Sequence, residues 1–431
     1  MMYKPTASLF FFFTLCGTAS FGESHGSDYN PGSKLNLTDV DVIIYIGYRI
    51  PSHGPQLLAG LIEDLNEVHS MYPQFDNTHN VYTPRYTPQR VRRVIFAPTG
   101  ELSSKTDGTL DVYNSATKAA TLAYLGAFRD RESILIVVGS DVVDNLTPWR
   151  AKNMIELNIA LGFLYPLYQP QNRIQRYEQF ALFNASREVA KFSESIESGR
   201  RIARHISSRQ NGGWNHESLL SLLQSTFQDN VIHVDILNAS SEGYSSGSFS
   251  GGKVIHLKFK PDSAGSTVFL ISSNAIDRGV ATIVGFFEIV RQLQPKETEF
   301  QAIIGCFNDS RNFLSGLNGN PMNEVLGVPI PSRNADVYVI GADNRDLKKK
   351  AYDYYGQKLD YEFGPLMADN DVDTFVRKSV GDKGSKMVFF LEQDSGSSVN
   401  PLYSTPIAGL VTRYLLKPAR QKNYLYQDVL Q

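Results

Sequence analysis

Polar side chains follow three apolar, strand-like segments of the chain. These are Asp277 after residues 267–272, Asn308 and Asp309 after residues 300–307, and Asp343 after residues 337–340. Because ligands in an open α/β sheet gather where the strands end at their carboxyl edge, the three aspartates are expected to lie at one edge. Carboxylate oxygens there could hold a divalent cation such as Zn²⁺ or Mn²⁺. Asp277 has a second interpretation, favoured here, in which it caps the helix that follows.

Other catalytic signatures are weak or absent. The string Gly-X-Ser-X-Gly at residues 243–247 matches a hydrolase nucleophile elbow, but that elbow needs a strand before it and a helix after it. Ser- and Gly-rich sequence lies on both sides here, which predicts a loop. The chain has no His-Glu-X-X-His and no Cys-X-X-Cys, the simplest zinc signatures. His233 and His256 fall on strand patterns, where a core or strand-face position is the default.

A first α/β unit is expected at the N-terminal side. Strand patterns at 40–47, 92–97 and 133–139 alternate with helical patterns at 56–71 and 111–128. The strand at 40–47 is a nearly continuous apolar run, as a strand buried on both faces requires. This alternation predicts a largely parallel sheet.

Two helical stretches, at 148–165 and 183–209, lead to a second α/β unit. The second stretch contains the basic, amphipathic run 195–204, whose composition alone predicts a surface helix. Strand patterns then follow at 231–237, 254–259, 267–272, 300–307 and 337–340. The helix expected at 278–293 is apolar on most sides, which predicts that it is buried.

Length and composition exclude several classes of protein. The chain has 431 residues, 42% of them hydrophobic, and a formal charge of −2, as expected of a globular protein of about two or three domains. A near-neutral balance argues against nucleic-acid binding, which normally needs a basic surface. Two cysteines exclude a disulfide-rich scaffold.

The N-terminus has the pattern of a secretory signal peptide. A short cationic start precedes the apolar core at 7–19, and small residues flank a cleavage point near residue 22, which leaves a leader at 23–39. The apolar core is too short to span a membrane, and no later segment is long enough without charges. Secretion would leave Cys306 as the single cysteine, either buried or paired with another chain, and its place after a strand-like run favours burial. Asn-X-Ser/Thr sequons, candidate glycosylation sites, stand at Asn36, Asn145, Asn184, Asn238 and Asn308.

Three segments carry a resemblance to a known family. Residues 92–99 with Gly100 and the Ala-rich helix, residues 196–204, and the strand and helix order of 267–355 resemble the leucyl (cytosol) aminopeptidases, in particular their animal aminopeptidase-like branch. The resemblance implies a macro-like α/β domain at 40–180 and an α/β/α zinc-exopeptidase-like domain with a mixed sheet at 181–431. It also implies a two-metal aminopeptidase activity and assembly as a homo-oligomer.

The chain departs from the family at its metal-binding motifs. Ser273 stands where the family has a metal-binding lysine, and the turn carrying a metal-binding aspartate is deleted. Asp277 and Asp343 match two metal-binding aspartates and are the remnant metal candidates, with Asp309 a weaker one. The bridging glutamate position holds Arg345 or Asn344, and a guanidinium cannot coordinate a cation. Arg345 is also the only weak candidate for the family's catalytic arginine, displaced by a deletion. Residues 356–431 are shorter than the family's C-terminal region and hard to align.

These departures favour a pseudoenzyme, a secreted glycoprotein that keeps the hydrolase fold and binds no cofactor. Such a protein would bind a peptide or protein ligand or serve as a structural component. The alternative is an active secreted metallo-aminopeptidase in which Asp277, Asp309, Asp343 and Asp346 rebuild a metal site. A third hypothesis, another group of zinc exopeptidases, ranks last because its His-X-Asp motif is absent. Carboxylates that converge with Arg345 turned away would support the metal site, and Arg345 paired with Asp277 or Asp343 would support a relic.

Overall fold

The computed structural model describes part of the chain. The described residues are 40–47, 50, 59–72, 80–87, 90–99, 116–117, 119–124, 132–139, 148–167, 177–182, 187–208, 216–238, 253–261, 265–272, 278–306, 336–342, 351–352, 358–359, 361–364, 385–390, 410–411 and 414–415.

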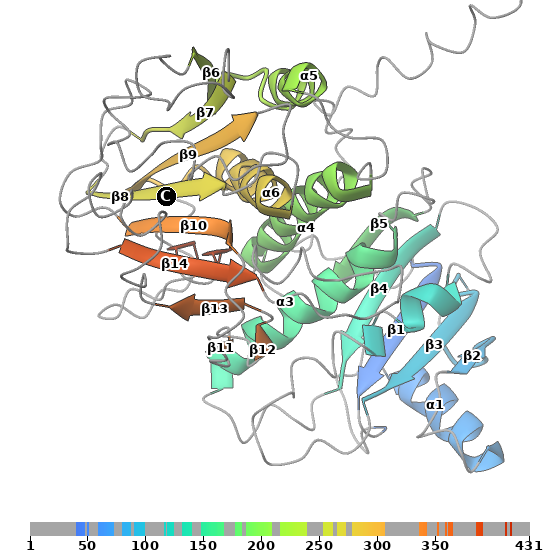
Figure 1. Cartoon of the computed structure of the whole chain (residues 1–431). Coiled ribbons are helices and arrows are strands. Elements are labelled where there is room, and N and C mark those ends of the chain that lie inside the picture. The colour runs from blue at the N-terminus through green and yellow to red at the C-terminus, as the bar shows by residue number, and fades with distance from the viewer. Residues whose placement is uncertain are drawn as a thin grey trace, which may run out of the picture.

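The first unit is built on a five-stranded sheet with the order β2-β3-β1-β4-β5 (Figure 1). Its strands are β1 (Val42–Gly47), β2 (Asn80–Tyr82), β3 (Arg93–Pro98), β4 (Glu132–Val138) and β5 (Tyr177–Leu182). All neighbours are parallel except β2, which pairs with β3 in the antiparallel sense at one edge. Every residue of β1 is buried, as its continuous apolar sequence predicts for a central strand.

Helices cover both faces of this sheet. Helix α1 (Ala59–Met71) places Leu61 and Leu65 in the core on one face. On the other face lie the helical residues 116–117 and 119–124 and helix α3 (Pro148–Leu167). There Phe163 packs on Phe180 of β5 with ring centroids 4.6 Å apart.

The second unit is built on a seven-stranded sheet with the order β13-β14-β10-β8-β9-β7-β6. Its strands are β6 (His233–Asn238), β7 (Lys253–Phe259), β8 (Ser266–Ser272), β9 (Thr298–Cys306), β10 (Asp336–Ala342), β13 (Tyr361–Gly364) and β14 (Ser385–Phe390). The central strands β9, β8, β10 and β14 are parallel, and the outer strands are antiparallel to their neighbours. The expected mixed sheet is therefore present. Strands β11 (Ala351–Tyr352) and β12 (Lys358–Leu359) form a separate pair.

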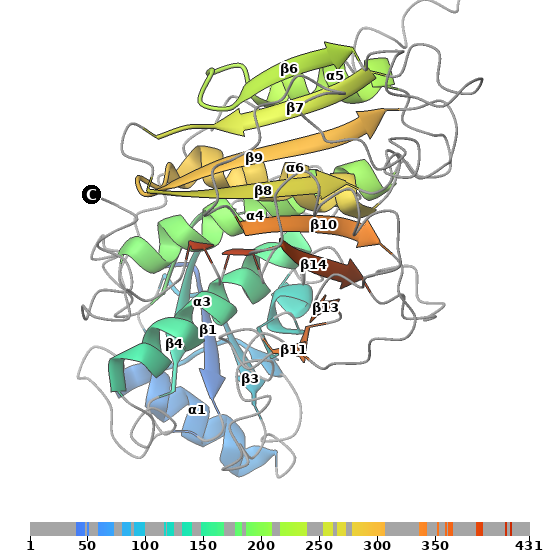
Figure 2. The ribbon, with the colours of Figure 1, turned by 60° about the vertical axis from the view of Figure 1, so that its left-hand side comes forward.

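Three helices cover one face of the large sheet (Figure 2). They are α4 (Arg187–Ser208), α5 (His216–Thr226) and α6 (Arg278–Leu293). All residues of α6 from 280 to 290 are buried, which confirms the expectation for this helix. Phe269, Ile271 and Ile303 point to the opposite face and are fully buried too, so the sheet is covered on both sides.

The surface helix expected at 195–204 is a wrong prediction, because this part of α4 is packed inside the protein. Its charged residues Glu197 and Arg200 are 1% and 7% exposed. They lie against α3, and the opposite side of α4 packs against α6. The polar face of the amphipathic pattern therefore meets other charged and aromatic side chains instead of solvent.

Among the helices in the described part of the chain, none is long and apolar enough to cross a membrane.

Candidate functional site

The carboxyl ends of β8, β9 and β10 form the edge at which the sequence predicts a site. Residue Ile271 of β8 pairs with Ile303 of β9 on one side and with Val339 of β10 on the other. The three strands run in the same direction (Figure 2) and end at Ser272, Cys306 and Ala342. The segments that lead to the three aspartates thus leave the sheet from adjacent, parallel strands.

The aspartates themselves, with Ser273, Asn308, Asn344, Arg345 and Asp346, lie outside the described residues. Convergence of the carboxylates as a metal site and pairing of Arg345 with an aspartate therefore both remain predictions. What the structure supplies is the scaffold beneath them, namely the strand ends and the helix that begins after Asp277.

A β-bulge interrupts β10 immediately before Asp343. Ile340 pairs with Val388 of β14 and Ala342 pairs with Phe389, so Gly341 between them has no partner on that side. Such a bulge bends its strand and re-aims the residues that follow, and bulges are common beside functional sites. Glycine inside a strand pattern is a sequence signal for a bulge, and Gly341 is the signal that the sequence analysis missed.

Helix α6 begins at Arg278, the residue after Asp277. The N-terminus of this helix therefore lies next to the carboxyl end of β8. Unsatisfied backbone N–H groups and the helix dipole stabilise negative charge at such a position. The helix start suits a carboxylate at residue 277 whether that carboxylate caps the helix or binds a cation.

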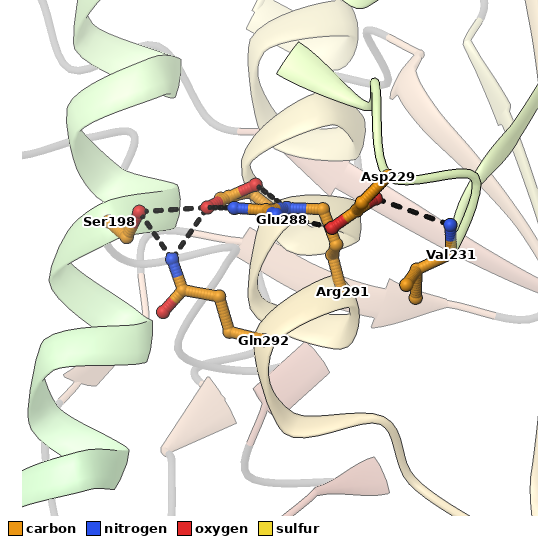
Figure 3. Close-up of polar contacts among 6 residues, drawn as sticks. All are labelled: Ser198, Asp229, Val231, Glu288, Arg291 and Gln292. Atoms are coloured by element: carbon orange, nitrogen blue, oxygen red, sulfur yellow. Dashed lines mark hydrogen bonds and ion pairs between the residues drawn. The ribbon is translucent and has the colours of Figure 1, made fainter. Parts of the chain in front are cut away.

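A buried polar network holds the other end of α6 in place (Figure 3). The Glu288 carboxylate, 2% exposed, accepts hydrogen bonds from Nε of Arg291 at 2.7 Å, from the Gln292 amide at 2.6 Å and from the Ser198 hydroxyl of α4 at 2.9 Å. Arg291 also donates to Asp229 at 2.7 Å. Asp229 in turn accepts from the backbone N–H of Val231 at 3.2 Å.

This network is a structural clamp and not a catalytic site. A serine hydroxyl beside a carboxylate can form a nucleophile and its base. Here, however, the oxygens of Glu288 are taken by fixed donors, two of them from the guanidinium of Arg291. The hydrogen bonds from Arg291 to Glu288 raise the pKa of Arg291, so the guanidinium stays charged. The clamp ties α4, α6 and the turn before β6 together.

A second charged cluster joins α4 to α3. Glu197 forms ion pairs with Arg200, at 3.2 Å, and with Arg204. Both guanidiniums lie over the ring of Tyr165, 5.4 and 5.0 Å from its centroid. Burial lowers the pKa of Arg200, and the neighbouring Glu197 opposes that shift. This cluster is enclosed by protein and offers no reactive group at a surface.

A polar chain joins two neighbouring strands of the large sheet, β7 and β9, at His256. This histidine is buried in β7, which confirms its expected core position, whereas His233 of β6 is exposed. A ring nitrogen of His256, Nε2, lies 3.1 Å from the Gln301 side-chain oxygen. The Gln301 amide donates to Glu299 at 2.9 Å. Burial lowers the pKa of His256, which favours the neutral ring.

Most of the other predicted residues lie outside the described part of the chain. Within the described ranges, no three His, Cys, Asp or Glu side chains gather as a metal site would require. Asn238 is the last residue of β6, while Asn36, Asn145, Asn184 and Asn308 lie outside the described residues, as does the Gly-X-Ser-X-Gly string at 243–247. Cys306 ends β9, but the placement of its side chain is not among those described.

Sequence comparison finds neither a matching family model nor a matching curated protein. Solved structures do match. The apo leucyl aminopeptidase from Trypanosoma cruzi has a TM-score of 0.53 at 12% identity, over 86% of this chain and 93% of that one. The bottromycin maturation enzyme BotP in complex with Mn has a TM-score of 0.50 at 10% identity, over 70% and 72%.

A mutant of tomato leucine aminopeptidase also matches, with a TM-score of 0.47 and 17% identity, over 64% of this chain. The chain spans 61% of the length of that tomato protein. At identities of 10% and 12%, the matches to BotP and to the Trypanosoma cruzi enzyme bear on architecture and not on chemistry. The order of strands and helices around the two sheets, together with the match over most of the Trypanosoma cruzi chain, shows that this protein has the leucyl aminopeptidase fold.

Proposed function

We propose that this protein is a secreted, glycosylated pseudoenzyme with the leucyl aminopeptidase fold, and that it binds a peptide or protein segment without hydrolysing it. The observation that carries the proposal is the set of residues at the family's metal-binding motifs. Ser273 replaces the lysine, one aspartate-bearing turn is missing, and Arg345 or Asn344 occupies the glutamate position.

The chemistry of those replacements supports loss of turnover. Two-metal hydrolysis needs several carboxylates to hold the ions, and the bound ions lower the pKa of the attacking water. Asp277 and Asp343 are the two ligands that match the family, and a hydroxyl or a guanidinium does not replace the others. The structural match to the Trypanosoma cruzi enzyme, in contrast, extends over 86% of this chain. A scaffold retained without its ligand set suits binding better than catalysis.

One observation favours the alternative, an active metallo-aminopeptidase. Asp277, Asp309 and Asp343 follow three adjacent parallel strands, and the last of them follows a bulge. Such an edge could rebuild a single-metal site from carboxylates alone. BotP, whose structure is similar, was solved in complex with Mn. If a cation is bound here, Asp277 and Asp343 are the residues that would hold it, and the ion would polarise a substrate carbonyl or activate water.

The deciding experiment measures hydrolysis and metal content on the same purified mature protein. We expect no turnover of leucyl-anilide substrates with added Mn²⁺ or Zn²⁺, and less than one bound metal ion per chain. The Asp277→Ala variant should match the wild type in both measurements. Its control is Asp235→Ala, which changes an exposed aspartate of β6 at the far side of the sheet. Metal-dependent turnover that is lost in Asp277→Ala and kept in Asp235→Ala would replace this proposal with the alternative.

Secretion and glycosylation are tested separately. Expression in a secretory cell should give a mature N-terminus near Glu23 and a loss of mass on treatment with N-glycosidase. An intact Met1 on protein retained in the cell would contradict this part of the proposal. Assembly as a homo-oligomer is also proposed, and light scattering measures it directly.

A further inference from the structure

Helix α3 is shared between the two α/β units. One of its faces packs into the core of the five-stranded sheet through Ile159, Ala160, Phe163 and Leu164. Another face belongs to the core of the seven-stranded sheet through Leu157 and Leu161. Because side chains four residues apart lie on one face of a helix, Tyr165 continues the stripe of Leu157 and Leu161 toward α4.

The stripe meets the charged cluster of α4 at Tyr165. The guanidinium carbons of Arg200 and Arg204 lie 5.4 and 5.0 Å from the centroid of the tyrosine ring. The side chains of both arginines are almost enclosed, at 9% and 11% exposure, and both pair with Glu197, which is 1% exposed. Glu197 thus pairs with both cations, and the face of the ring supplies negative potential beside them.

Separation of α3 from α4 would disrupt this cluster. The two guanidiniums would lose the face of the Tyr165 ring, and the apolar stripe of Leu157 and Leu161 would meet water. Partly desolvated cation–π contacts are stronger than exposed ones, so the loss of two of them is costly. The favourable contacts are therefore available at one relative position of the two helices.

Domains in one chain move relative to each other unless the interface between them is large and apolar. We propose that Tyr165, Glu197, Arg200 and Arg204 lock α3 to α4. The two α/β units then move as one rigid body and unfold together. The lock is a property of the scaffold. It holds whether the edge of the larger sheet binds a ligand, as proposed above, or cleaves one.

Hydrogen exchange of the full mature chain, followed by mass spectrometry, tests the lock. In the wild type, amides in the central strands of both sheets, such as β1 and β8, should exchange through the same global opening, with equal protection. In Tyr165→Leu, the protection of the two sheets should diverge by about tenfold to a hundredfold, since two partly buried cation–π contacts are lost. Tyr165→Phe keeps the ring and should leave the two sheets equally protected.

The matched control is Tyr124→Leu. Tyr124 lies inside the first unit, with the guanidinium carbon of Arg93 at 5.7 Å from its ring centroid. Its loss should weaken protection in both sheets equally, because the lock remains. Unequal protection of β1 and β8 in the wild type would overturn the proposal even if Tyr165→Leu fails to fold. Equal protection in Tyr165→Leu, as in Tyr124→Leu, would overturn it as well.

Discussion

Gly199 of α4 lies directly against the backbone of Gly285 of α6. A Cβ added at Gly199 would come within 2.6 Å of Cγ1 of Ile289 and closer still to the carbonyl oxygen of Gly285. Real Cβ atoms do not approach other heavy atoms so closely. The crossing of these two helices, beneath the face of the larger sheet, therefore depends on a hydrogen at this position.

Gly199→Ala should consequently destabilise the protein, although alanine is the better helix former. Overpacking of a tight interior costs about 1–3 kcal/mol, which equals or exceeds the roughly 1 kcal/mol that alanine contributes over glycine in a helix. Urea unfolding would measure the difference. Gly265→Ala is the control, because its Cβ would find nothing nearer than 4.0 Å. Equal stability of the two variants would show that α4 and α6 can move apart.

Glu288→Gln tests the clamp shown in Figure 3. The change keeps the shape of the side chain but removes the charge that satisfies Arg291, so we expect a loss of about 3 kcal/mol in the free energy of unfolding. Ser198→Ala removes one neutral donor and should cost about 1 kcal/mol. Glu297→Gln, at an exposed glutamate, is the control and should change little. The ordering is checked by urea unfolding, and a cost for Ser198→Ala above that for Glu288→Gln would contradict it.

Asp64 binds a segment that precedes β3. Its carboxylate, 1% exposed, accepts hydrogen bonds from the backbone N–H groups of Arg85, Tyr86 and Thr87, at 2.6, 3.0 and 2.8 Å. Asp64→Ala leaves these donors without their acceptor, and we expect a loss of about 3–5 kcal/mol in the free energy of unfolding. The neighbouring change Glu63→Ala, on the exposed face of α1, should cost little. Thermal unfolding of both variants provides the measurement.

Glu194 of α4 should make stability fall as pH rises. Burial raises the pKa of its carboxyl to about 7, so ionisation is harder in the folded than in the unfolded chain. Its stabilising contribution is complete below the unfolded pKa, about 4.3, and is lost as pH rises through the folded value. Glu194→Gln should therefore be more stable than the wild type at pH 8, by on the order of 1–3 kcal/mol, and equal to it at pH 4. A stabilisation of equal size at both pH values would exclude titration as the cause.

His256 should have the opposite effect. Burial lowers its pKa, so the folded protein prefers the neutral ring. Its contribution is present above the unfolded pKa, about 6.5, and is lost as pH falls below it. The wild type should therefore lose more stability between pH 7 and pH 5 than His256→Gln does. Unfolding curves at the two pH values, with the exposed His233→Gln as control, distinguish this from general acid destabilisation.

The parts of the fold that were predictable from sequence are those with strong local patterns. Burial of β1 and of α6 could be predicted because both sequences are apolar on nearly all sides. The burial of α4 was not predictable in this way. The arginines of α4 pack on the ring of Tyr165, which belongs to α3. The sequence of α4 by itself therefore cannot reveal this contact.

The candidate site was predictable at the level of topology. Strand order and direction bring the ends of β8, β9 and β10 together, as the alternation of elements indicated. On its other side β10 pairs with β14, which lies in the C-terminal region 356–431 that is hard to align with the family. Its pairing depends on contacts with a strand far away in sequence, and such contacts leave no local signal. The positions of the aspartate side chains depend on the segments after the strands, for which the sequence offers only residue types.

The two faces of α3 limit how this chain can change in length. One inserted residue would turn the rest of the helix by about 100°. Leu161 and Tyr165 would then rotate away from α4, and Phe163 and Leu164 would rotate away from the five-stranded sheet. Insertions and deletions inside α3 would thus damage two cores at once. In any set of relatives of this protein, α3 should be the helix whose length varies least.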